Sequence, residues 1–234
     1  SREEPMRRAE AEGILLAHGW LAGQPQAFQR RFLALADMKT FGTCEDVYRA
    51  GEEDGGICGI AAGSFAVYVS TPLAPPSLAH ILRSGMWFGY GPLVTRRQRT
   101  MTFSAVEASV VLLLPQHALR GIFSGESEEG YRLAALTEYG MDVAIQTISN
   151  LLIRDSDRRI AATLLHVTST CGDIIPHTSD AYYLTQTQLG EMANVSRHIV
   201  NKTLSCFEQR GWVAVGYNKI FVLDPKALAA FAYD

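Results

Sequence analysis

The sequence has little of what a membrane, secreted or metal-dependent protein would need. No apolar run approaches the ~18 residues of a membrane-spanning helix. The first residues, SREEPMRRAEAEG, are too acidic and polar for a signal peptide. We therefore expect a cytoplasmic protein with no membrane contact and no metal site. No two cysteines are closely spaced, which disfavours a zinc site and a disulfide framework; the four are Cys44, Cys58, Cys171 and Cys206.

A surplus of charge of either sign is also absent. The 234 residues hold 21 Lys and Arg against 24 Asp and Glu, a formal net charge of −3, which taken alone argues against a nucleic-acid partner. The acidity is concentrated, however: residues 126–155 carry 2 basic and 6 acidic side chains, whereas residues 185–223 carry 4 and 2. DNA binding is therefore not excluded, and only modest non-specific binding is expected.

Short apolar segments separated by turn residues fill the region from Phe41 to about Phe123. They are rich in β-branched and aromatic residues, which is typical of an antiparallel sandwich or barrel. Before them, residues 1–35 have helical spacing that is broken at Gly19, Gly23 and Pro25, which predicts two short helices. The predicted strands are 46–48, 56–61, 65–69, 78–82, 86–88, 101–106 and 110–114.

A long stretch without proline, Gly130 to Arg154, predicts the longest helix. Two apolar faces on it imply two packing partners. One partner is the β region; the other is either a second copy of the helix, as in a coiled coil, or a core that buries the helix completely. Periodicity alone leaves both possibilities open. The first stripe is Met141, Ile145, Ile148 and Leu152, and the second is Leu133, Leu136, Ala144 and Leu151.

Residues 184–212 have the pattern of a helix-turn-helix, LTQTQLGEMANVSRHIVNKTLSCFEQRGW. Thr185 with Gln188 forms a capping box at the first helix. Asn194 tolerates the left-handed backbone of the turn, Ser196 caps the second helix and Gly211 closes it. The following VAVGYNKIFVL alternates and turns, which predicts a hairpin wing.

The polar residues of this segment suit contacts with DNA. Arg197 is able to make a bidentate contact to guanine, Asn201 to read adenine, and His198 to donate to guanine or phosphate. The DNA phosphates suit a helix N-terminus, here with Thr185 and Gln186. They also suit a lysine at the wing tip, here Lys219. The alternative is a solvated polar face on a small helical subdomain. The candidate DNA-binding residues are Thr185, Gln186, Ser196, Arg197, His198, Asn201, Lys202 and Lys219.

Four stretches resemble the Crp/Fnr family of bacterial transcription regulators: IAAGSFAVYV at 60–69, GMWFGYGPL at 85–93, RDSDRRIAATLLHV at 154–167 and, most specifically, LTQTQLGEMANVSRHIVNKTL at 184–204. The resemblance implies an α+β fold with an N-terminal double-stranded β-roll like that of cyclic-nucleotide-binding domains, a long central dimerisation helix and a C-terminal winged helix-turn-helix. We assign these parts to residues 1–125, 126–155 and 156–234.

The resemblance also implies partners. It implies a homodimer that binds a two-fold operator on double-stranded DNA, with half-sites one helical turn apart. The first stripe of the central helix (Met141, Ile145, Ile148 and Leu152) then becomes the dimer contact. An activator would also contact RNA polymerase, for which the sequence shows no surface.

In the second helix of the helix-turn-helix, which would read the DNA bases, the sequence departs from the family pattern. The family often has S-R-E-x-V-x-R, whereas this chain has Ser196-Arg197-His198-Ile199-Val200-Asn201-Lys202. A carboxylate at the third position accepts from cytosine, which His198 does only through a neutral ring nitrogen. The base preference there is therefore expected to differ.

The effector pocket departs further from members that bind cyclic AMP. Tyr90 stands where those members have the Glu that holds the ribose, and the two positions that contact adenine correspond to Ala144 and Ile145. Each lost hydrogen bond is worth roughly 0.5–1.5 kcal/mol, so affinity falls by about tenfold or more. Cyclic AMP is therefore disfavoured, the effector is unknown and no cofactor is expected. The candidate pocket residues are Gly89, Tyr90, Gly91, Arg99, Thr100, Ala144 and Ile145, with Arg99-Thr100 near the family's Arg-Ser pair.

Other chemistries have less support in the sequence. The basic loop 96–99 serves either an anionic ligand, in a small-ligand sensor, or only the solvent. Haem would need an axial ligand, for which His80 and His117 are the candidates. Cys44 and Cys58 are either a redox pair or two free buried thiols. There is no nucleophile–base–acid set and no phosphate-binding glycine loop, so an enzyme is not expected.

Overall fold

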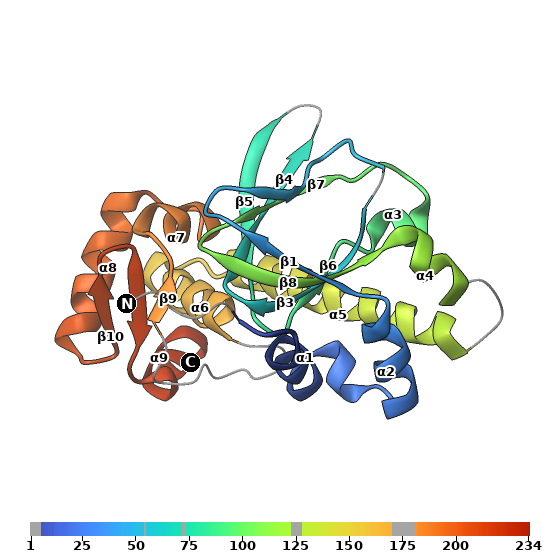
Figure 1. Ribbon diagram of the computed structural model, residues 1–234. Coiled ribbons are helices and arrows are strands. Elements are labelled where there is room, and N and C mark those ends of the chain that lie inside the picture. Colours follow the sequence, from blue (N-terminus) through green and yellow to red (C-terminus); the bar gives the residue numbers. More distant parts are fainter. Residues whose placement is uncertain (1–5, 54, 72–73, 123–127, 170–180) are drawn as a thin grey trace.

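The computed structural model describes residues 6–53, 55–71, 74–122, 128–169 and 181–234. Two four-stranded antiparallel sheets form a roll, a long helix runs beneath it, and a small helical unit with its own three-stranded sheet lies at one end (Figure 1). The predicted fold class is therefore confirmed. The predicted boundary after residue 125 lies outside the described residues.

The roll is built from strands β1 to β8, ordered β1-β8-β3-β6 in one sheet and β2-β7-β4-β5 in the other. All seven predicted strands are present. The strand β1 was not predicted, because three of its five residues are exposed and it carries few apolar side chains. The bounds are β1 Asp37–Phe41, β2 Asp46–Tyr48, β3 Gly56–Ala62, β4 Ser64–Thr71, β5 Ala74–Arg83, β6 Trp87–Phe88, β7 Met101–Ala105 and β8 Ser109–Pro115.

Aromatic and β-branched side chains fill the space between the two sheets. The rings of Phe88 and Phe103 stack with centroids 4.6 Å apart, and Phe65 lies against Phe88 at 5.3 Å. The register pairs Ile60 with Val111 in the first sheet, and both are fully buried. The apolar segments thus became strands because alternate side chains enter one common core.

Helices cover the outer face of the first sheet, and residues 1–35, for which two short helices were predicted, supply three. They are α1 (Arg8–Ala17), the 3₁₀ helix η1 (Trp20–Gly23) and α2 (Gln26–Ala34). The Trp20 ring lies 5.8 Å from that of Trp87 on β6, and its indole N–H donates to the carbonyl oxygen of Arg132 at 2.9 Å. This one side chain therefore joins the sheet to the start of the long helix. Two short helices of the roll, α3 (Gly91–Thr95) and α4 (Gln116–Ile122), were not predicted.

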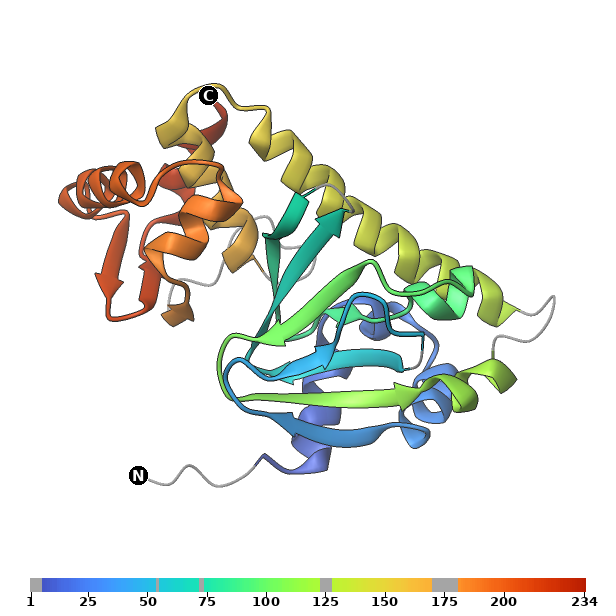
Figure 2. The same ribbon diagram turned by 90° about the horizontal axis from the view of Figure 1, so that it is seen from above.

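The long helix α5 (Glu128–Leu151) has one covered and one uncovered apolar side. Leu133 and Leu136 are buried in the same core as Trp20. Figure 2 shows α5 along one side of the roll, with no other element on its far side. A helix buried all round is thus ruled out for this chain. The uncovered residues, called the outer stripe below, are Met141, Ile145, Ile148 and Leu152, with exposed fractions of 54%, 54%, 59% and 75%. Among the described residues, no helix has both the length and the hydropathy that crossing a membrane requires.

The C-terminal unit is a winged helix. Asp155 caps its first helix, as predicted, by accepting a hydrogen bond from the Arg158 N–H at 2.9 Å. Its three strands are ordered β10-β11-β9, and its last helix was not predicted. The bounds are α6 Ser156–Thr168, β9 Ala181–Tyr183, α7 Gln186–Met192, α8 Arg197–Gln209, β10 Val213–Gly216, β11 Lys219–Val222 and α9 Pro225–Tyr233.

The winged helix is docked onto strand β5 of the roll. Leu78 and Ile81 of β5 share one core with α6, α7 and α8. The Leu78 N–H donates to the Glu191 carboxylate of α7 at 2.7 Å. Arg83 is buried and donates to the carbonyl of Val167 at 2.9 Å, in the last turn of α6, where a cation is favoured by the helix dipole.

A histidine pair lies in the same contact. The rings of His80 on β5 and His166 on α6 are tilted, with centroids 4.5 Å apart. Burial lowers the pKa of both, that of His166 to about 4, and the His80 pKa is lowered further by His166 and Arg83. Both rings are therefore neutral at pH 7.

The histidine pair predicts a loss of stability in acid. Unfolded histidines bind protons near pH 6.5, whereas the folded His166 does so only near pH 4. The neutral pair therefore contributes to the free energy of unfolding above pH 6.5, and this contribution is lost as the pH falls towards 4. We expect the free energy of unfolding, measured by chemical denaturation, to fall by on the order of 2 kcal/mol between pH 7.5 and 5 because of His166. His166→Gln should remove this part of the pH dependence, and the exposed control His117→Gln should keep it. An equal slope in both variants would contradict the assignment.

Candidate functional site

The first helix of the helix-turn-helix begins as predicted. The Thr185 hydroxyl accepts from the Gln188 N–H at 3.1 Å, and the Thr185 N–H donates to the Gln188 side chain at 2.9 Å. This capping box satisfies backbone groups that a helix start leaves unpaired. It is made entirely by residues within three positions of one another.

The turn and the second helix are also set by local chemistry. Asn194 has a φ of +51°, the left-handed conformation predicted for the turn. The Ser196 hydroxyl accepts from the Ile199 N–H at 3.4 Å at the start of α8. At its end the N–H groups of Gly211 and Trp212 donate to carbonyls of the last turn, with Gly211 at a φ of +72°.

Arg159 holds the turn in place. Its guanidinium donates to the carbonyl oxygen of Ala193 at 2.7 Å and to that of Ile153 at 2.6 Å. It therefore joins the turn between α7 and α8 to the segment after α5. A second link on the same side is the Thr203 hydroxyl of α8, which donates to the Asp157 carboxylate of α6 at 2.5 Å. The orientation of α8 thus follows that of α5 and α6.

A groove of about 420 Å³ runs between the start of α7, the outer face of α8 and the wing. We call it the reading groove. Five of the eight candidate DNA-binding residues line it: Thr185, Gln186, Arg197, Asn201 and Lys219. The other three do not: Ser196 caps α8, and His198 and Lys202 lie exposed on the outer face of α8. On the inner face Val200, Leu204 and Phe207 are buried.

The wing differs from the prediction in one respect. The tip of the hairpin is formed by Tyr217, 92% exposed, and Asn218, whose φ is +54°. Lys219 is not at the tip; it is the first residue of β11, and its ammonium group lies 4.2 Å from the centre of the Tyr183 ring. Tyr217 was overlooked, although the two-residue turn between the paired residues Gly216 and Lys219 places it there.

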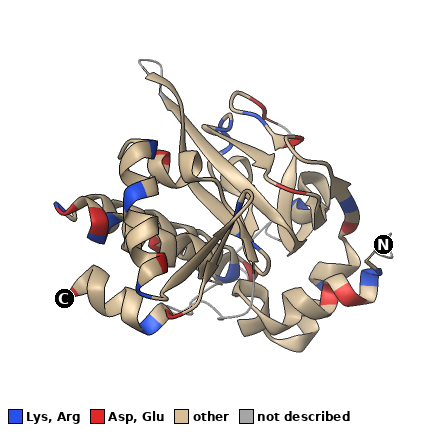
Figure 3. Ribbon diagram, turned by 90° about the vertical axis from the view of Figure 1, so that its left-hand side faces the viewer, with Lys and Arg blue, Asp and Glu red and all other residues tan. Residues whose placement is uncertain are grey.

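The charges of this unit are mixed, as Figure 3 shows. Both acidic side chains of residues 185–223 have internal roles. Glu191 accepts from Leu78 of the roll, and Glu208 accepts from the Val215 N–H at 2.9 Å. Arg197, in contrast, lies exposed beside the reading groove, so that the groove carries a positive charge although the chain is acidic overall.

A second, larger cavity of about 540 Å³ lies between the roll and α5. We call it the β-roll cavity. Six of the seven candidate pocket residues line it: Gly89, Tyr90, Gly91, Arg99, Thr100 and Ala144. Ile145 does not, because it points outward in the outer stripe. Val143, Thr147 and Ile148 of α5 line the cavity but were not predicted, and Ile148 belongs to the outer stripe as well.

Tyr90 lies across the cavity wall onto α5. A Cβ placed on Gly140 would overlap the Tyr90 hydroxyl, which explains a glycine in the middle of a long helix. Burial raises the pKa of the Tyr90 phenol. Tyr90 therefore acts in this structure as a neutral contact between the roll and α5.

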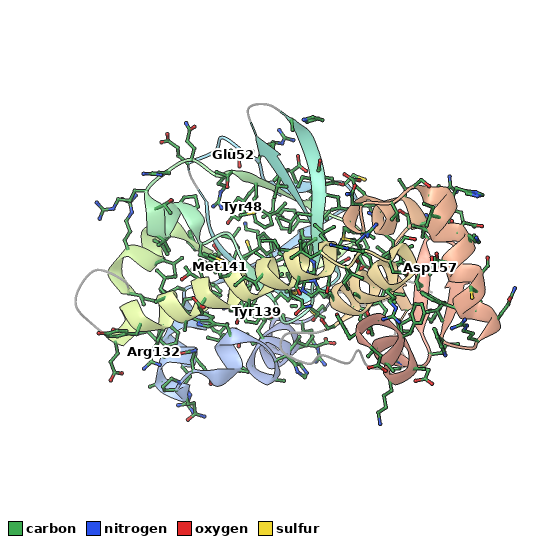
Figure 4. The ribbon with its side chains drawn as sticks, turned by 180° about the vertical axis from the view of Figure 1, so that it is seen from behind. Tyr48, Glu52, Arg132, Tyr139, Met141 and Asp157 are labelled. Carbon is green, nitrogen blue, oxygen red and sulfur yellow. The ribbon has the colours of Figure 1, made fainter. Side chains whose placement is uncertain are left out.

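Arg99 is tied into the roll. Its guanidinium lies 3.7 Å from the centre of the Tyr48 ring and donates to the Gly89 carbonyl at 2.9 Å. Burial lowers its pKa. Figure 4 shows Tyr48 in the roll above α5, on which Tyr139 and Met141 are labelled. Arg99 thus holds the loop after β6 against the sheet.

The residues considered for haem binding or redox sensing lie in different parts of the roll. His80 lines the β-roll cavity but is stacked on His166, and His117 is exposed on α4. Cys58 is buried with its thiol 3.5 Å from the Tyr48 hydroxyl, whereas Cys44 is exposed, so only one of the two is a buried thiol. The part of the chain that the structure describes contains no cluster of three metal-binding side chains.

Comparison with known proteins matches both halves of the chain to family models. Residues 38–126 match the cyclic nucleotide-binding domain, and residues 158–231 match the Crp-like helix-turn-helix domain. A relative in Mycobacterium tuberculosis, described as a CRP-like cAMP-activated global transcriptional regulator, is 22% identical over 187 residues, which are 78% of this chain and 82% of the relative.

Solved structures show the same fold. FixK2 from Bradyrhizobium japonicum aligns with a TM-score of 0.71 at 15% identity, covering 85% of this chain and 98% of its own. A CRP-family transcriptional regulator from Thermus thermophilus aligns with a TM-score of 0.65 at 22% identity, covering 84% of this chain and 97% of its own.

The contact between Tyr90 and Gly140 predicts a coupling between the two positions. Alanine is favoured over glycine within a helix by roughly 0.5–1 kcal/mol. We expect Gly140→Ala to lower the free energy of unfolding of the wild type by about 1 kcal/mol, since the methyl group meets the phenol oxygen. In a Tyr90→Phe background that oxygen is gone but the ring carbon that carried it stays 3.0 Å from the added Cβ, so the same change should be close to neutral. Urea denaturation of the four proteins measures the coupling, and an equal effect in both backgrounds would contradict the contact.

Proposed function

The chain belongs to the Crp/Fnr family of transcription regulators, and we propose that it binds a two-fold DNA operator as a homodimer, without cyclic AMP as its effector. It is a regulator with a Crp-like helix-turn-helix and a cyclic nucleotide-binding domain, not an enzyme. The main support for the proposal is the reading groove, where the start of α7, the exposed side of α8 and the wing meet.

The arrangement of the groove suits DNA. An α-helix fits the major groove, and α8 carries Arg197, Asn201 and Lys202 on its exposed face. Arg197 is near the N-terminus of α8, where recognition helices reach base edges. The Asn201 amide donates to the Gln186 side chain at 3.3 Å, so adenine readout by Asn201 requires this bond to exchange for one to the base. Lys219 and the α7 N-terminus flank these residues and suit the phosphates.

The outer stripe supports the homodimer. It leaves four large apolar side chains in water at helical spacing, three on α5 and the fourth, Leu152, directly after it. A second copy of α5 covers such a row as in a coiled coil, and two copies related by a two-fold axis present two copies of α8. The operator then has two half-sites one helical turn apart.

The proposal that cyclic AMP is not the effector is supported by the walls of the β-roll cavity. Tyr90 offers a phenol where ribose binding would need a carboxylate, and it is in contact with Gly140. Ala144 supplies only a methyl group. The Arg99 guanidinium already binds the Gly89 carbonyl and the Tyr48 ring.

Two basic residues of the reading groove should differ in their effect. On DNA selected from a random pool, Arg197→Ala should cost roughly 1–3 kcal/mol of binding and relax the preference at one base position. Lys219→Ala should instead weaken all sequences alike and flatten the dependence of affinity on salt. The matched control is Arg210→Ala, because Arg210 lies over the Trp212 ring away from the groove. Identical behaviour of the first two variants in quantitative gel-shift titrations would refute these roles.

A single charge in the outer stripe should abolish the dimer. Ile145→Glu would place a carboxylate in the proposed contact at a residue outside the β-roll cavity, so we expect a monomer by sedimentation and a large loss of operator affinity. Leu16→Glu makes the same change at a partly exposed apolar residue of α1, outside the stripe, and should leave the dimer intact. A dimeric Ile145→Glu protein would mean that the two copies meet elsewhere.

A further inference from the structure

The β-roll cavity has the size of a small-molecule site and walls that are mostly apolar. Its volume of about 540 Å³ lies within the range of ligand pockets. Both sheets and α5 contribute apolar walls, among them Val67, Leu82, Met86, Phe88, Phe103 and Val143. No acidic side chain is found in the lining described by the structure.

Five polar side chains of the lining lie in residues 95–100, and others, among them His80, Tyr90, Tyr139 and Thr147, lie elsewhere in the cavity wall. Several of them already have partners within the protein. The Thr95 hydroxyl donates to the Gly91 carbonyl at 2.9 Å, and the Gln98 amide donates to the Glu53 carboxylate at 3.2 Å. Arg99 is held by Gly89 and Tyr48. The segment 95–100 therefore suits one hydrogen-bonding group of a ligand, at the margin of an apolar space.

A cyclic nucleotide does not match these walls. It carries a phosphate, a ribose hydroxyl and a base with several polar edges, all of which lose water on binding. A polar group that is buried without a partner costs roughly 1–3 kcal/mol, and a charged one costs more. Residues 95–100, with Arg97, offer partners at one place only, whereas the apolar side chains on the sheets and the methyl of Ala144 on α5 offer none.

We propose that the β-roll cavity binds a small molecule with an apolar body and a single hydrogen-bonding end, in place of a cyclic nucleotide. The proposal deepens the function given above, because it names the ligand class of the regulator's β-roll. The body lies against Val67, Phe103 and Val143, and the polar end meets residues 95–100. The binding energy comes from apolar area removed from water.

A neutral fluorescent probe tests the proposal. N-phenyl-1-naphthylamine has an aromatic body and one N–H, and its emission rises when it leaves water. Titrated into the full chain, it should bind with a micromolar Kd. Val143→Trp and Thr147→Trp fill the cavity from α5 and should each weaken binding by about tenfold or more. Asp142→Trp, next to Val143 but exposed and outside the lining, should leave the Kd within about twofold. Cyclic AMP and cyclic GMP should not displace the probe at micromolar concentration.

Three results would overturn the assignment: no binding of the probe, equal binding by all three tryptophan variants, or displacement by a micromolar cyclic nucleotide. Circular dichroism and the DNA selection, run on the same proteins, separate this inference from the proposed function. If the probe binds in the expected pattern but no DNA is enriched, the regulatory function fails and the ligand class stands. If DNA is enriched while the probe does not bind, the ligand class alone fails.

Discussion

The packing of α5 on two sides is the constraint on which the rest of the structure depends. On one side Leu133 and Leu136 enter the core that joins the N-terminal helices to the roll, and Val143 closes the β-roll cavity. On the other side lies the outer stripe. Covering one such side chain contributes roughly 1 kcal/mol or more, so the eight of two copies reach about 10 kcal/mol. Association costs free energy of the same order, so one added charge is enough to decide the outcome.

The same helix links the two candidate sites. Its last turn leads through Ile153 to Arg159, and Arg159 holds the turn before α8. A further contact is on β5, where the His80 ring lines the β-roll cavity and lies against the tilted ring of His166 on α6. The cavity walls on α5 and β5 therefore each lead to the winged helix, one through Arg159 and the other through His166.

Sequence reasoning worked best where local chemistry decides the structure. The capping box at Thr185, the turn at Asn194 and the cap at Asp155 each depend on residues within a few positions of one another, and all three were predicted. Most strands were found because their side chains enter a core. The strand β1 was missed since it is half exposed, and α9 because an alanine-rich segment has only a weak apolar pattern.

The cavity was harder to predict, because its walls come from distant segments. The contact of Tyr90 with Gly140 joins residues 50 positions apart, and only the fold shows why the helix has a glycine there. Ile145 was assigned to both the pocket and the dimer contact, and the structure places it in the outer stripe alone, whereas Ile148 of that stripe also lines the cavity.

The central claim is that the outer stripe pairs two chains and so sets the symmetry of the DNA they read. Selection of bound DNA from a random pool by the full chain tests this most directly. The account predicts an enriched inverted repeat whose half-site centres are about 10 base pairs apart. Enrichment of a single half-site, of a direct repeat, or of no sequence at all would contradict it.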